Sequence, residues 1–363
     1  MIKFEFRKNN AGAFKQVFVQ VLLLAQSTGI MKKLGTISVD GTKIHANASR
    51  HKAVSYKYAK EQIAKYEKEV ADILEQAQKI DNTENEISLP EEIAVREKRI
   101  SVLKEAVRQM EETQKEICEH EKEEYERKIK ESDEDDKKNG KTSKRKKHKE
   151  PHDKVSDDSQ VNFTDSGSRI MKFGNSKNFE QCYNLQAAVD ADSMLIVGTY
   201  PTQKATDRQE IKKCVESVDE KIEREDTVYA VADTGYFSGK LIEETEKKNP
   251  GVKIICSTER IHHGKTVQEI FEKLPVSLPE EKDDVPITTG IMRARLKTVQ
   301  GQKIYSKRKT TVEPVFGIIK RVMGFQQFLM RGLEKIDIEW NLVTISYNIS
   351  RMFSLKKLQL TKI

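Results

Sequence analysis

Three acidic residues have the setting of a site for phosphoryl-transfer chemistry. Asp40 and Asp233 each follow a short apolar segment typical of a buried strand, and Glu313 precedes the apolar segment 315–319. A carboxylate at the end of a buried strand is unfavourable unless another group compensates its charge. Two such carboxylates held close together repel, which raises one pKa or recruits a cation. Mg²⁺ prefers carboxylate and phosphate oxygens, so two bound ions could hold the attacking and leaving oxygens of a phosphodiester.

Glu313 has a basic companion in the sequence. Lys320 follows it by two helical turns, which predicts that both side chains share one face of a helix and that the ammonium can reach a phosphate beside the bound ion. Pro314 is tolerated in the first turn of a helix, so we expect Glu313 at a helix start. Each acid also has a simpler interpretation. Asp40 and Asp233 could be turn residues, and Glu313 could be an exposed helix acid.

Other polar residues are weaker candidates. Asp190 and Asp192 lie in a predicted hairpin turn, where local backbone hydrogen bonds favour Asp, and Asp165 lies in a predicted loop. We expect structural roles for all three. The pair His262 and His263 has no partner at metal-ligand spacing, and we expect both side chains to be exposed to solvent.

The elements that position these residues follow from the apolar pattern. Alternating or continuous apolar segments predict five strands, at 36–40, 183–189, 194–200, 227–232 and 252–256. Helices are expected over 211–222, 238–248 and 291–356, and Asp207 with Glu210 forms a capping-box pattern before the first of these. This element order is that of an α/β fold, a ribonuclease-H-like mixed five-stranded sheet with flanking helices. In this topology the first and fourth strands are neighbours, which places Asp40 beside Asp233.

A long helical-hairpin insertion is predicted after the first strand, over residues 55–120. It is indicated by two heptad-spaced series of apolar residues, namely Ile63, Tyr66, Val70, Ile73, Ala77 and Ile80, then Ile93, Ile100, Leu103, Val107, Met110 and Ile117. Residues 121–160 are dense in charge and predict a flexible linker. The sheet domain is therefore expected in two parts, 31–54 and 161–363, and an amphipathic helix is expected within 1–30.

Composition excludes several classes of protein. The chain has 363 residues, of which 36% are hydrophobic and 34% charged, with a net charge of +7 that permits a polyanionic partner. Its longest apolar run is too short to span a membrane. The cysteines show no CxxC pair and no histidine at metal-ligand spacing, which argues against a disulfide scaffold or a zinc ribbon and favours a reduced, cytoplasmic setting.

Five blocks of sequence, in order, carry a resemblance to a known family. They are Ser38-Val-Asp-Gly-Thr-Lys-Ile44, Asn162-Phe-Thr-Asp165, Tyr183-Asn-Leu-Gln-Ala-Ala-Val-Asp190, Ala232-Asp-Thr-Gly-Tyr-Phe-Ser238 and Val312-Glu-Pro-Val-Phe-Gly-Ile-Ile-Lys320. The chain resembles bacterial insertion-sequence transposases of the DDE type, closest to the IS1182 group within the IS4/IS5-like superfamily. The resemblance extends from about residue 30 to the C-terminus.

The resemblance implies a DNA transposase with catalytic and metal-binding acids at Asp40, Asp233 and Glu313 and with Mg²⁺ or Mn²⁺ as cofactor. Its expected substrate is double-stranded DNA, both the terminal inverted repeats and the target, on which the protein is expected to assemble as a homo-oligomer in the bacterial cytoplasm, associated with the nucleoid. The residues expected to contact DNA are Lys320, Arg321, Arg308, Lys309, Tyr305, Arg169 and Lys172.

The chain departs from this family in two ways. Few residues precede Asp40, so we expect that an N-terminal helical domain is missing and that residues 1–30 are its remnant. Sister families carry a Tyr-Arg-Glu-Lys signature, which Tyr305, Arg308, Glu313 and Lys320 fit with a longer gap between the arginine and the glutamate. Two alternatives remain open: a ribonuclease-H-like nuclease without strand transfer, and a truncated, non-catalytic protein that binds DNA or a full-length relative.

Overall fold

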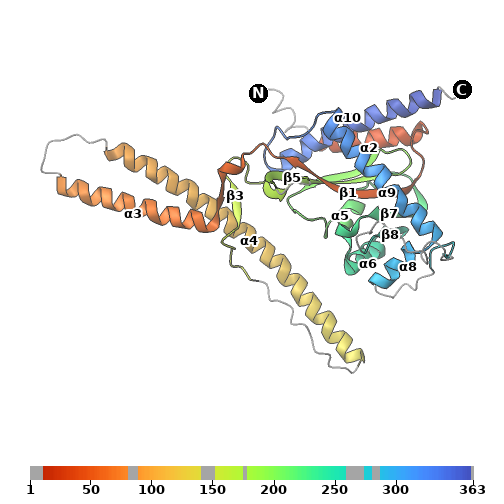
Figure 1. The fold of residues 1–363 in the computed structure, drawn as a ribbon, viewed down its shortest axis with the longest axis horizontal. Coiled ribbons are helices and arrows are strands. Elements are labelled where there is room, and N and C mark those ends of the chain that lie inside the picture. The colour runs from red at the N-terminus through yellow and green to blue at the C-terminus, as the bar shows by residue number, and fades with distance from the viewer. Residues whose placement is uncertain are drawn as a thin grey trace. The chain divides into compact units, whose positions relative to one another are not determined.

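The computed structural model describes residues 11–80, 89–139, 152–174, 178–258, 274–279 and 287–360. The chain divides into two compact units. The sheet unit comprises Met1–Ala48 and Gly167–Ile363, and the helical unit comprises Ser49–Ser166. Both are drawn in Figure 1, where the elements carry the labels used below.

The sheet unit is built on one mixed, curled sheet. Its strands are β1 (Leu34–His45), β4 (Arg169–Lys172), β5 (Phe179–Asp190), β6 (Ile196–Thr202), β7 (Arg224–Ala232) and β8 (Val252–Cys256). Five of them follow the order β6-β5-β1-β7-β8, with β7 parallel to both β1 and β8 and β5 antiparallel to both β1 and β6. The short strand β4 pairs with the first residues of β5, next to β6. This arrangement is compatible with the expected ribonuclease-H-like fold.

Strand β1 is longer than its apolar pattern predicts. It continues through Gly41 to His45 and pairs with β5 over this whole stretch, whereas its pairing with β7 ends at Ser38. The prediction that Asp40 closes the strand is therefore wrong. The polar residues after Asp40 stay extended because β5 supplies hydrogen-bond partners that the local sequence does not reveal.

Helices cover both faces of the sheet. The helical elements of this unit are α2 (Ala11–Ser27), α5 (Ile211–Glu216), the turn η2 (Thr234–Tyr236), α6 (Gly239–Lys248), α8 (Thr289–Leu296), α9 (Val299–Gly317), the π-helical turn η3 (Ile318–Val322) and α10 (Leu333–Leu360). Ile304 of α9 packs on Val231 and Ile255 at one face. On the opposite face, Cys214 of α5 donates its thiol hydrogen to Gln186 of β5. Helix α2 packs against α10.

Glu313 and Pro314 lie inside α9, fourteen or more residues after its N-cap Thr298, so the prediction that Glu313 begins a helix is wrong. Packing explains the difference, because the flanking side chains of Val312 and Val315 are fully buried. The missing N–H of Pro314 removes one helical hydrogen bond, and the wider π-helical turn η3 follows within the same continuous helical segment.

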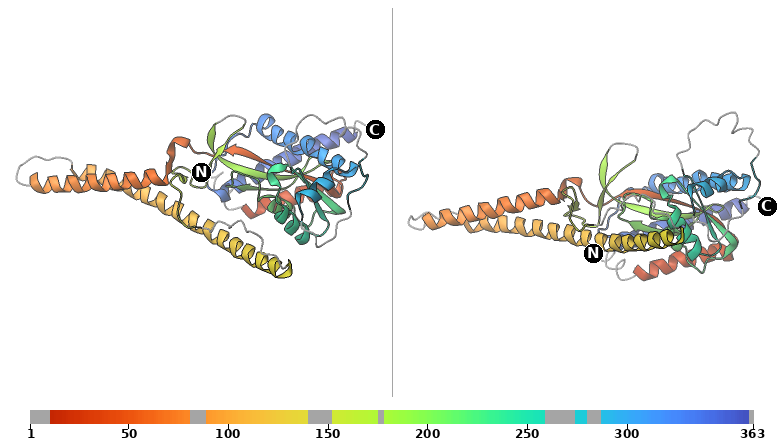
Figure 2. Two further views of the ribbon diagram at one scale, coloured as in Figure 1. Left: turned by 60° about the horizontal axis from the view of Figure 1, so that its bottom comes forward. Right: turned by 90° about the horizontal axis from the view of Figure 1, so that it is seen from below.

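The helical unit consists of the turn η1 (Arg50–Lys52), strands β2 (Ala53–Ser55) and β3 (Gln160–Asn162), and helices α3 (Tyr56–Ile80) and α4 (Leu89–Asn139). Strands β2 and β3 pair antiparallel. Ion pairs join α3 to α4 in opposite chain directions, with Lys60 bound to Glu111 near one end and Lys104 bound to Glu67 further along. The two helices therefore run antiparallel, side by side, as Figure 2 shows from two directions.

Helix α4 continues to Asn139, through part of the segment that composition predicts to be flexible. Lysine and glutamate are good helix formers and support one another at i, i+4 spacing, which lets the backbone stay helical without a core. Residues 140–151 of that segment lie outside the described residues. Within the part of the chain that the structure describes, no helix is both long and apolar enough to cross a membrane.

Candidate active site

The first two candidate acids lie side by side at the centre of the sheet. Ser38 of β1 pairs with Val231 of β7 in parallel register, and two further residues along both chains bring Asp40 level with Asp233. The predicted adjacency of these residues is therefore present. The two carboxylates are close enough for the charge of Asp233 to raise the pKa of Asp40.

Asp40 has the most perturbed carboxyl group of the site. Burial raises its pKa from 3.8 to about 7, and the negative charges of Asp233 and Asp207 act in the same direction. The N–H of Gly41, which donates to Asp40 Oδ1 at 2.8 Å, and the guanidinium of Arg308 oppose this rise in pKa. Without a bound cation, Asp40 is therefore about half protonated near neutral pH.

Asp233 directly follows β7 and also caps the turn η2. It is the N-cap of η2, where its Oδ1 accepts a hydrogen bond of 2.7 Å from the N–H of Gly235. Its carbonyl oxygen accepts a bond of 2.8 Å from the thiol of Cys256 on the neighbouring strand β8. The simpler interpretation of Asp233 as a turn residue thus describes its local bonding, while the register places the same side chain beside Asp40.

Glu313 pairs with Arg308, whose charge also acts on Asp40. The side chain of Glu313 is 54% exposed and lies 3.8 Å from Nη1 of Arg308, one turn earlier in α9. Arg308 is only 12% exposed, and its backbone oxygen accepts a hydrogen bond from Ser38 of β1. Among the described residues, no hydrogen-bond acceptor is found for its buried Nε. Arg308 therefore offers a donor for an anion at the edge of the carboxylate pair.

Lys320 lies within electrostatic reach of Asp40. It stands in the π-helical turn η3, and its ammonium lies 5.9 Å from the ring centre of Phe173. Burial lowers the pKa of Lys320, whereas the charges of Cys182 and Asp40 act to raise it. A partly buried cation next to a carboxylate pair is suited to hold a phosphate oxygen.

The remaining predicted DNA contacts lie on α9, η3 and β4 and differ in their exposure. Tyr305 is half-buried in α9, burial raises the pKa of its hydroxyl, and the guanidinium of Arg308 lies 6.0 Å from its ring centre. Arg321 is exposed beside Lys320, while the side chain of Lys309 lies outside the described residues. Arg169 and Lys172 lie on β4, where Arg169 donates to the carbonyl oxygen of Ser168 and the backbone oxygen of Lys172 accepts from Lys43.

Asp207 is a neighbour of Asp40 that the sequence pattern misassigned. The predicted capping box is wrong, because α5 begins after Glu210, whose side chain caps nothing, and ends at Glu216. Asp207 Oδ1 instead accepts hydrogen bonds from the side-chain amides of Asn184 at 2.8 Å and Gln186 at 2.6 Å. Gly41 makes room for this arrangement. A Cβ there would lie 2.6 Å from Asp207 Oδ1.

The amide of Gln186 connects Asp207 to the turn that carries Asp233. Its nitrogen donates to Asp207, and its oxygen accepts from the hydroxyl of Tyr236, the last residue of η2. Tyr236 is fully buried, and burial raises the pKa of its hydroxyl well above the usual value. A neutral phenol donor therefore holds η2 against β5. No sequence pattern indicated this contact, because its members are distant along the chain.

The donor set fits a divalent ion in part. Asp40 and Asp233 provide two adjacent carboxylates, and the perturbed pKa of Asp40 reflects a place where a cation would relieve repulsion. Among the described residues, however, no three His, Cys, Asp or Glu side chains are grouped closely enough to hold a metal ion. The third acid, Glu313, is directed to Arg308 instead.

The other candidate acids have local partners. Asp190 is buried, and its Oδ2 accepts bonds from the N–H and hydroxyl of Ser193, as expected for a turn residue. Asp192 is exposed and forms an ion pair of 2.9 Å with Lys307. Asp165 is buried in the helical unit. The histidine pair at 262 and 263 lies outside the described residues.

The curled mixed sheet with its central carboxylate pair is compatible with the ribonuclease-H-like class. The chain matches the family model described as the transposase DDE domain over residues 141–349, more than half of its length. The chain therefore belongs to the transposase DDE domain family, an enzyme family whose substrate is DNA. The match includes Asp233 and Glu313 but begins after Asp40. No curated protein and no solved structure matches the chain.

Proposed function

We propose that the chain is a DNA transposase of the IS1182 group that cleaves phosphodiesters at insertion-sequence ends and joins them to target DNA. The observation that carries the proposal is that Asp233, directly after β7, lies close enough to Asp40 of the neighbouring strand β1 for its charge to raise the pKa of Asp40, which burial brings to about 7. Membership of the transposase family supports it independently. The expected DNA is the terminal inverted repeats and the target, bound by a homo-oligomer in the cytoplasm.

Asp40, Asp233 and Glu313 are the proposed ligands of two Mg²⁺ or Mn²⁺ ions. When bound, such ions stabilise the charge that develops on the attacking and leaving oxygens of the phosphodiester. Asp40 would hold an ion as its carboxylate, and because burial raises its pKa to about 7, ion binding would compete with the proton near neutral pH. Glu313 would be the third ligand; its side chain is exposed and would have to leave Arg308 to take that role.

Arg308 and Lys320 are the proposed phosphate-holding groups. Arg308 has a buried Nε without an acceptor among the described residues, and it would gain one from a phosphate oxygen. Lys320 is partly buried within electrostatic reach of Asp40, so its ammonium would bind a phosphate oxygen held beside that carboxylate. Arg321, Lys309, Tyr305, Arg169 and Lys172 are proposed to contact DNA further from the carboxylate pair.

The decisive experiment compares Asp233→Asn with Asp192→Asn, since Asp192 is an exposed acid that only pairs with Lys307. Each variant is incubated with Mg²⁺ and duplex DNA carrying the inverted repeats that flank the gene. Asp233→Asn should abolish both nicking and joining, and Asp192→Asn should retain both. Binding of Mn²⁺, followed by electron paramagnetic resonance, should weaken only in Asp233→Asn. Full activity of Asp233→Asn would refute the site, and nicking without any joined product would favour a nuclease.

A further inference from the structure

A groove in the helical unit has no role in the chemistry described above. It has a volume of about 570 Å³ and is formed between the first turns of α3, the first third of α4, the segment around β2 and the residue after β3. Its polar lining includes Lys52, Lys98 and Arg99, and its aromatic lining includes Tyr58, Tyr66 and Phe163. No carboxylate lines it.

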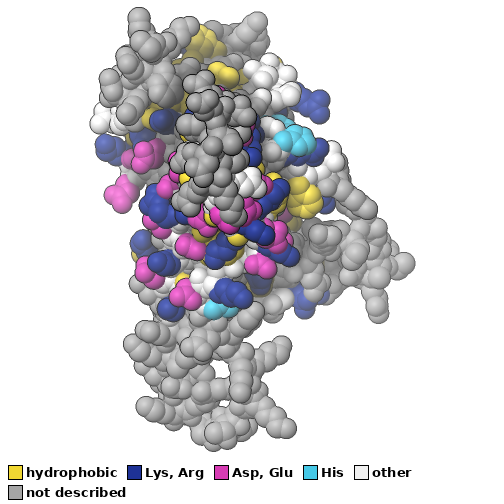
Figure 3. All heavy atoms as spheres, turned by 90° about the vertical axis from the view of Figure 1, so that its left-hand side faces the viewer, with side chains coloured by type: hydrophobic (Ala, Val, Ile, Leu, Met, Phe, Trp, Pro, Cys, Tyr) yellow, Lys and Arg dark blue, Asp and Glu magenta, His cyan; other side chains and the backbone are white. Residues whose placement is uncertain are grey.

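Three basic side chains line this groove, and no acid lines it with them. Several basic side chains elsewhere on α3 and α4 are bound to nearby acids; examples are Arg96 with Glu69 and Lys104 with Glu67. On the face drawn in Figure 3, Lys and Arg side chains are likewise interspersed with Asp and Glu. Among the described residues, no ion pair is found for the three cations at the groove. The lining of the groove therefore carries positive charge with no acid to balance it.

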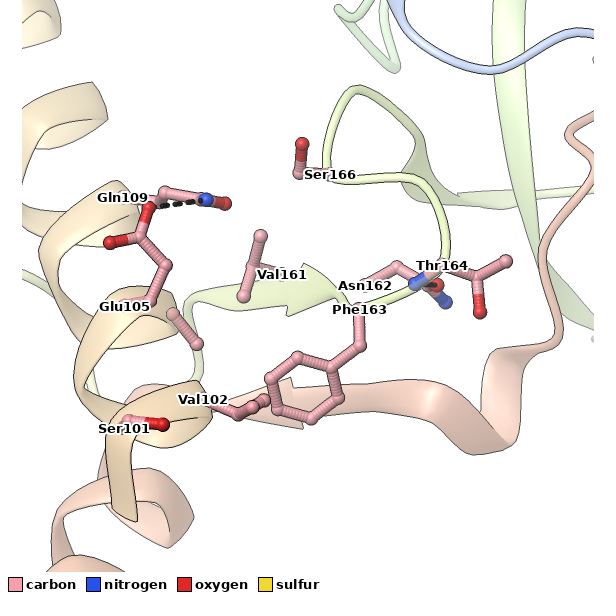
Figure 4. Close-up of a pocket in the computed structure, with 10 residues that line it drawn as sticks. Ser101, Val102, Glu105, Gln109, Val161, Asn162, Phe163, Thr164 and Ser166 are labelled. Atoms are coloured by element: carbon pink, nitrogen blue, oxygen red, sulfur yellow. Dashed lines mark hydrogen bonds between the residues drawn. The ribbon is translucent and has the colours of Figure 1, made fainter. Parts of the chain in front are cut away.

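Two aromatic rings that line the groove are exposed to solvent and are not packed into the core of the helical unit. Tyr58 is 53% and Phe163 is 45% exposed, and neither belongs to the core cluster of the helical unit. Phe163 extends from the loop after β3 towards Val102 of α4, as Figure 4 shows. Phe163 and Val102 also line a second cavity, whose one acid, Glu105, is already bound by Arg108. Exposed rings beside unpaired cations form a surface for a planar, negatively charged ligand.

We propose that this groove binds a single strand of DNA, with unpaired bases stacked on Tyr58 and Phe163 and phosphates held by Lys52, Lys98 and Arg99. Grooves that combine aromatic rings with basic residues bind single-stranded nucleic acid in this way. The proposal rests on the proposed function only in taking DNA as the polyanion. It adds a second DNA contact, in a unit that carries none of the three candidate acids.

The chemistry of the groove favours a single strand over the two alternatives. In duplex DNA the bases stack on each other and present only their edges in the grooves, so exposed rings gain little from them. An acidic protein segment could form ion pairs with the basic side chains. It would have no planar groups to stack on the rings of Tyr58 and Phe163. Only an unpaired nucleotide chain matches rings and cations together.

Binding is tested with the full chain carrying Asp40→Asn and Asp233→Asn, in EDTA, by fluorescence anisotropy. The probes are labelled oligothymidylate of about 15 nucleotides, within the range that one such site covers, a hairpin duplex of similar length, and polyglutamate. Tyr58→Ala and Phe163→Ala should each raise the dissociation constant for oligothymidylate by about fivefold or more. Tyr58→Trp should restore binding, since it keeps a stacking face.

Charge is tested separately with a matched control. The double variant Lys98→Ala and Arg99→Ala should reduce the salt dependence of oligothymidylate binding by about 1.4 in logarithmic slope, as expected for two lost phosphate contacts. Lys104→Ala on the same helix, whose ammonium is bound to Glu67, should leave the slope unchanged. Far-UV circular dichroism checks that the helices stay intact, which we expect because both rings lie outside the core.

Three results would overturn the proposal: ring variants that bind oligothymidylate within about twofold of the parent, tighter binding of the duplex than of the single strand, or equal binding of polyglutamate. None of these outcomes depends on catalysis. A failure of the catalytic proposal appears instead as absent nicking by the chain with intact acids. The two proposals can therefore fail separately.

Discussion

Replacing Asp40 with Asn should stabilise the metal-free sheet unit, and the gain should increase with pH. Asp40 is buried beside Asp233, so the structure favours its protonated form. Asparagine has nearly the same shape, carries no charge and presents the same oxygen to the N–H of Gly41, which donates to Asp40 at 2.8 Å. The substitution therefore removes the charge while keeping the packing and this hydrogen bond.

The magnitude follows from the shifted pKa. In the unfolded chain the carboxyl ionises near 3.8, and in the folded protein near 7. Between these values the folded state holds a proton that the unfolded state has lost, so stability falls as pH rises, by about 1.4 kcal/mol for each pH unit. The full loss is about 4 kcal/mol and is complete above pH 7. Asp40→Asn should therefore gain about 2 kcal/mol at pH 5 and about 4 kcal/mol at pH 8.

The assay is urea unfolding in EDTA from pH 5 to pH 8, followed by the fluorescence of the single tryptophan. Trp340 is fully buried in α10, so it reports on the sheet unit. Asp192→Asn, at an exposed acid, serves as the control. The difference in unfolding free energy between this variant and the parent should stay the same from pH 5 to pH 8. Added Mg²⁺ should reduce the difference in unfolding free energy between Asp40→Asn and the parent, because only the parent keeps the carboxylate proposed to bind the ion. A gain that is equal at both pH values, or a loss of stability, would show that the burial argument for Asp40 is wrong.

Three further substitutions test the packing and charge around the site. Lys320→Ala should weaken DNA binding in an anisotropy titration and reduce the salt slope by about 0.9, as for one lost phosphate contact; an unchanged slope would place Lys320 away from the DNA. Arg295→Met should lower the free energy of urea unfolding by about 3–5 kcal/mol, because the guanidinium is 2% exposed and binds Glu246 through two bonds of 2.6 and 3.0 Å; a loss below about 1 kcal/mol would contradict this. Tyr236→Phe should lower the same quantity by about 1 kcal/mol by removing the donor to Gln186, and a gain in stability would refute the role of that bond.

Much of the sheet could be predicted from local patterns. The strand 252–256 has the predicted bounds, and α6 is within one residue of its predicted start. The adjacency of Asp40 and Asp233 followed from element order alone, because the first and fourth strands of this topology are parallel neighbours. Apolar periodicity records burial, and burial is decided mainly by position in the sheet.

The errors arose where distant partners decide the structure. Gly41 and the polar residues after it lack strand character, yet β5 holds them extended. Pro314 favours a helix start, yet buried neighbours in α9 keep it inside. Asp207 fits a local cap, yet the amides of Asn184 and Gln186 take its carboxylate. Each case is a tertiary contact overriding a local preference, which one sequence does not display.

The length of β1 divides the candidate acids into fixed and movable ones. Because the strand stays hydrogen-bonded to β5 on both sides of Asp40, this carboxylate cannot swing out without breaking the middle of the sheet. Asp233 is anchored through Gly235 and Cys256. Glu313, exposed on its helix, has the freedom that the others lack. In the proposed three-acid centre, Glu313 is therefore the acid whose side chain would have to move, while pairing with β5 holds the backbone around Asp40 in place.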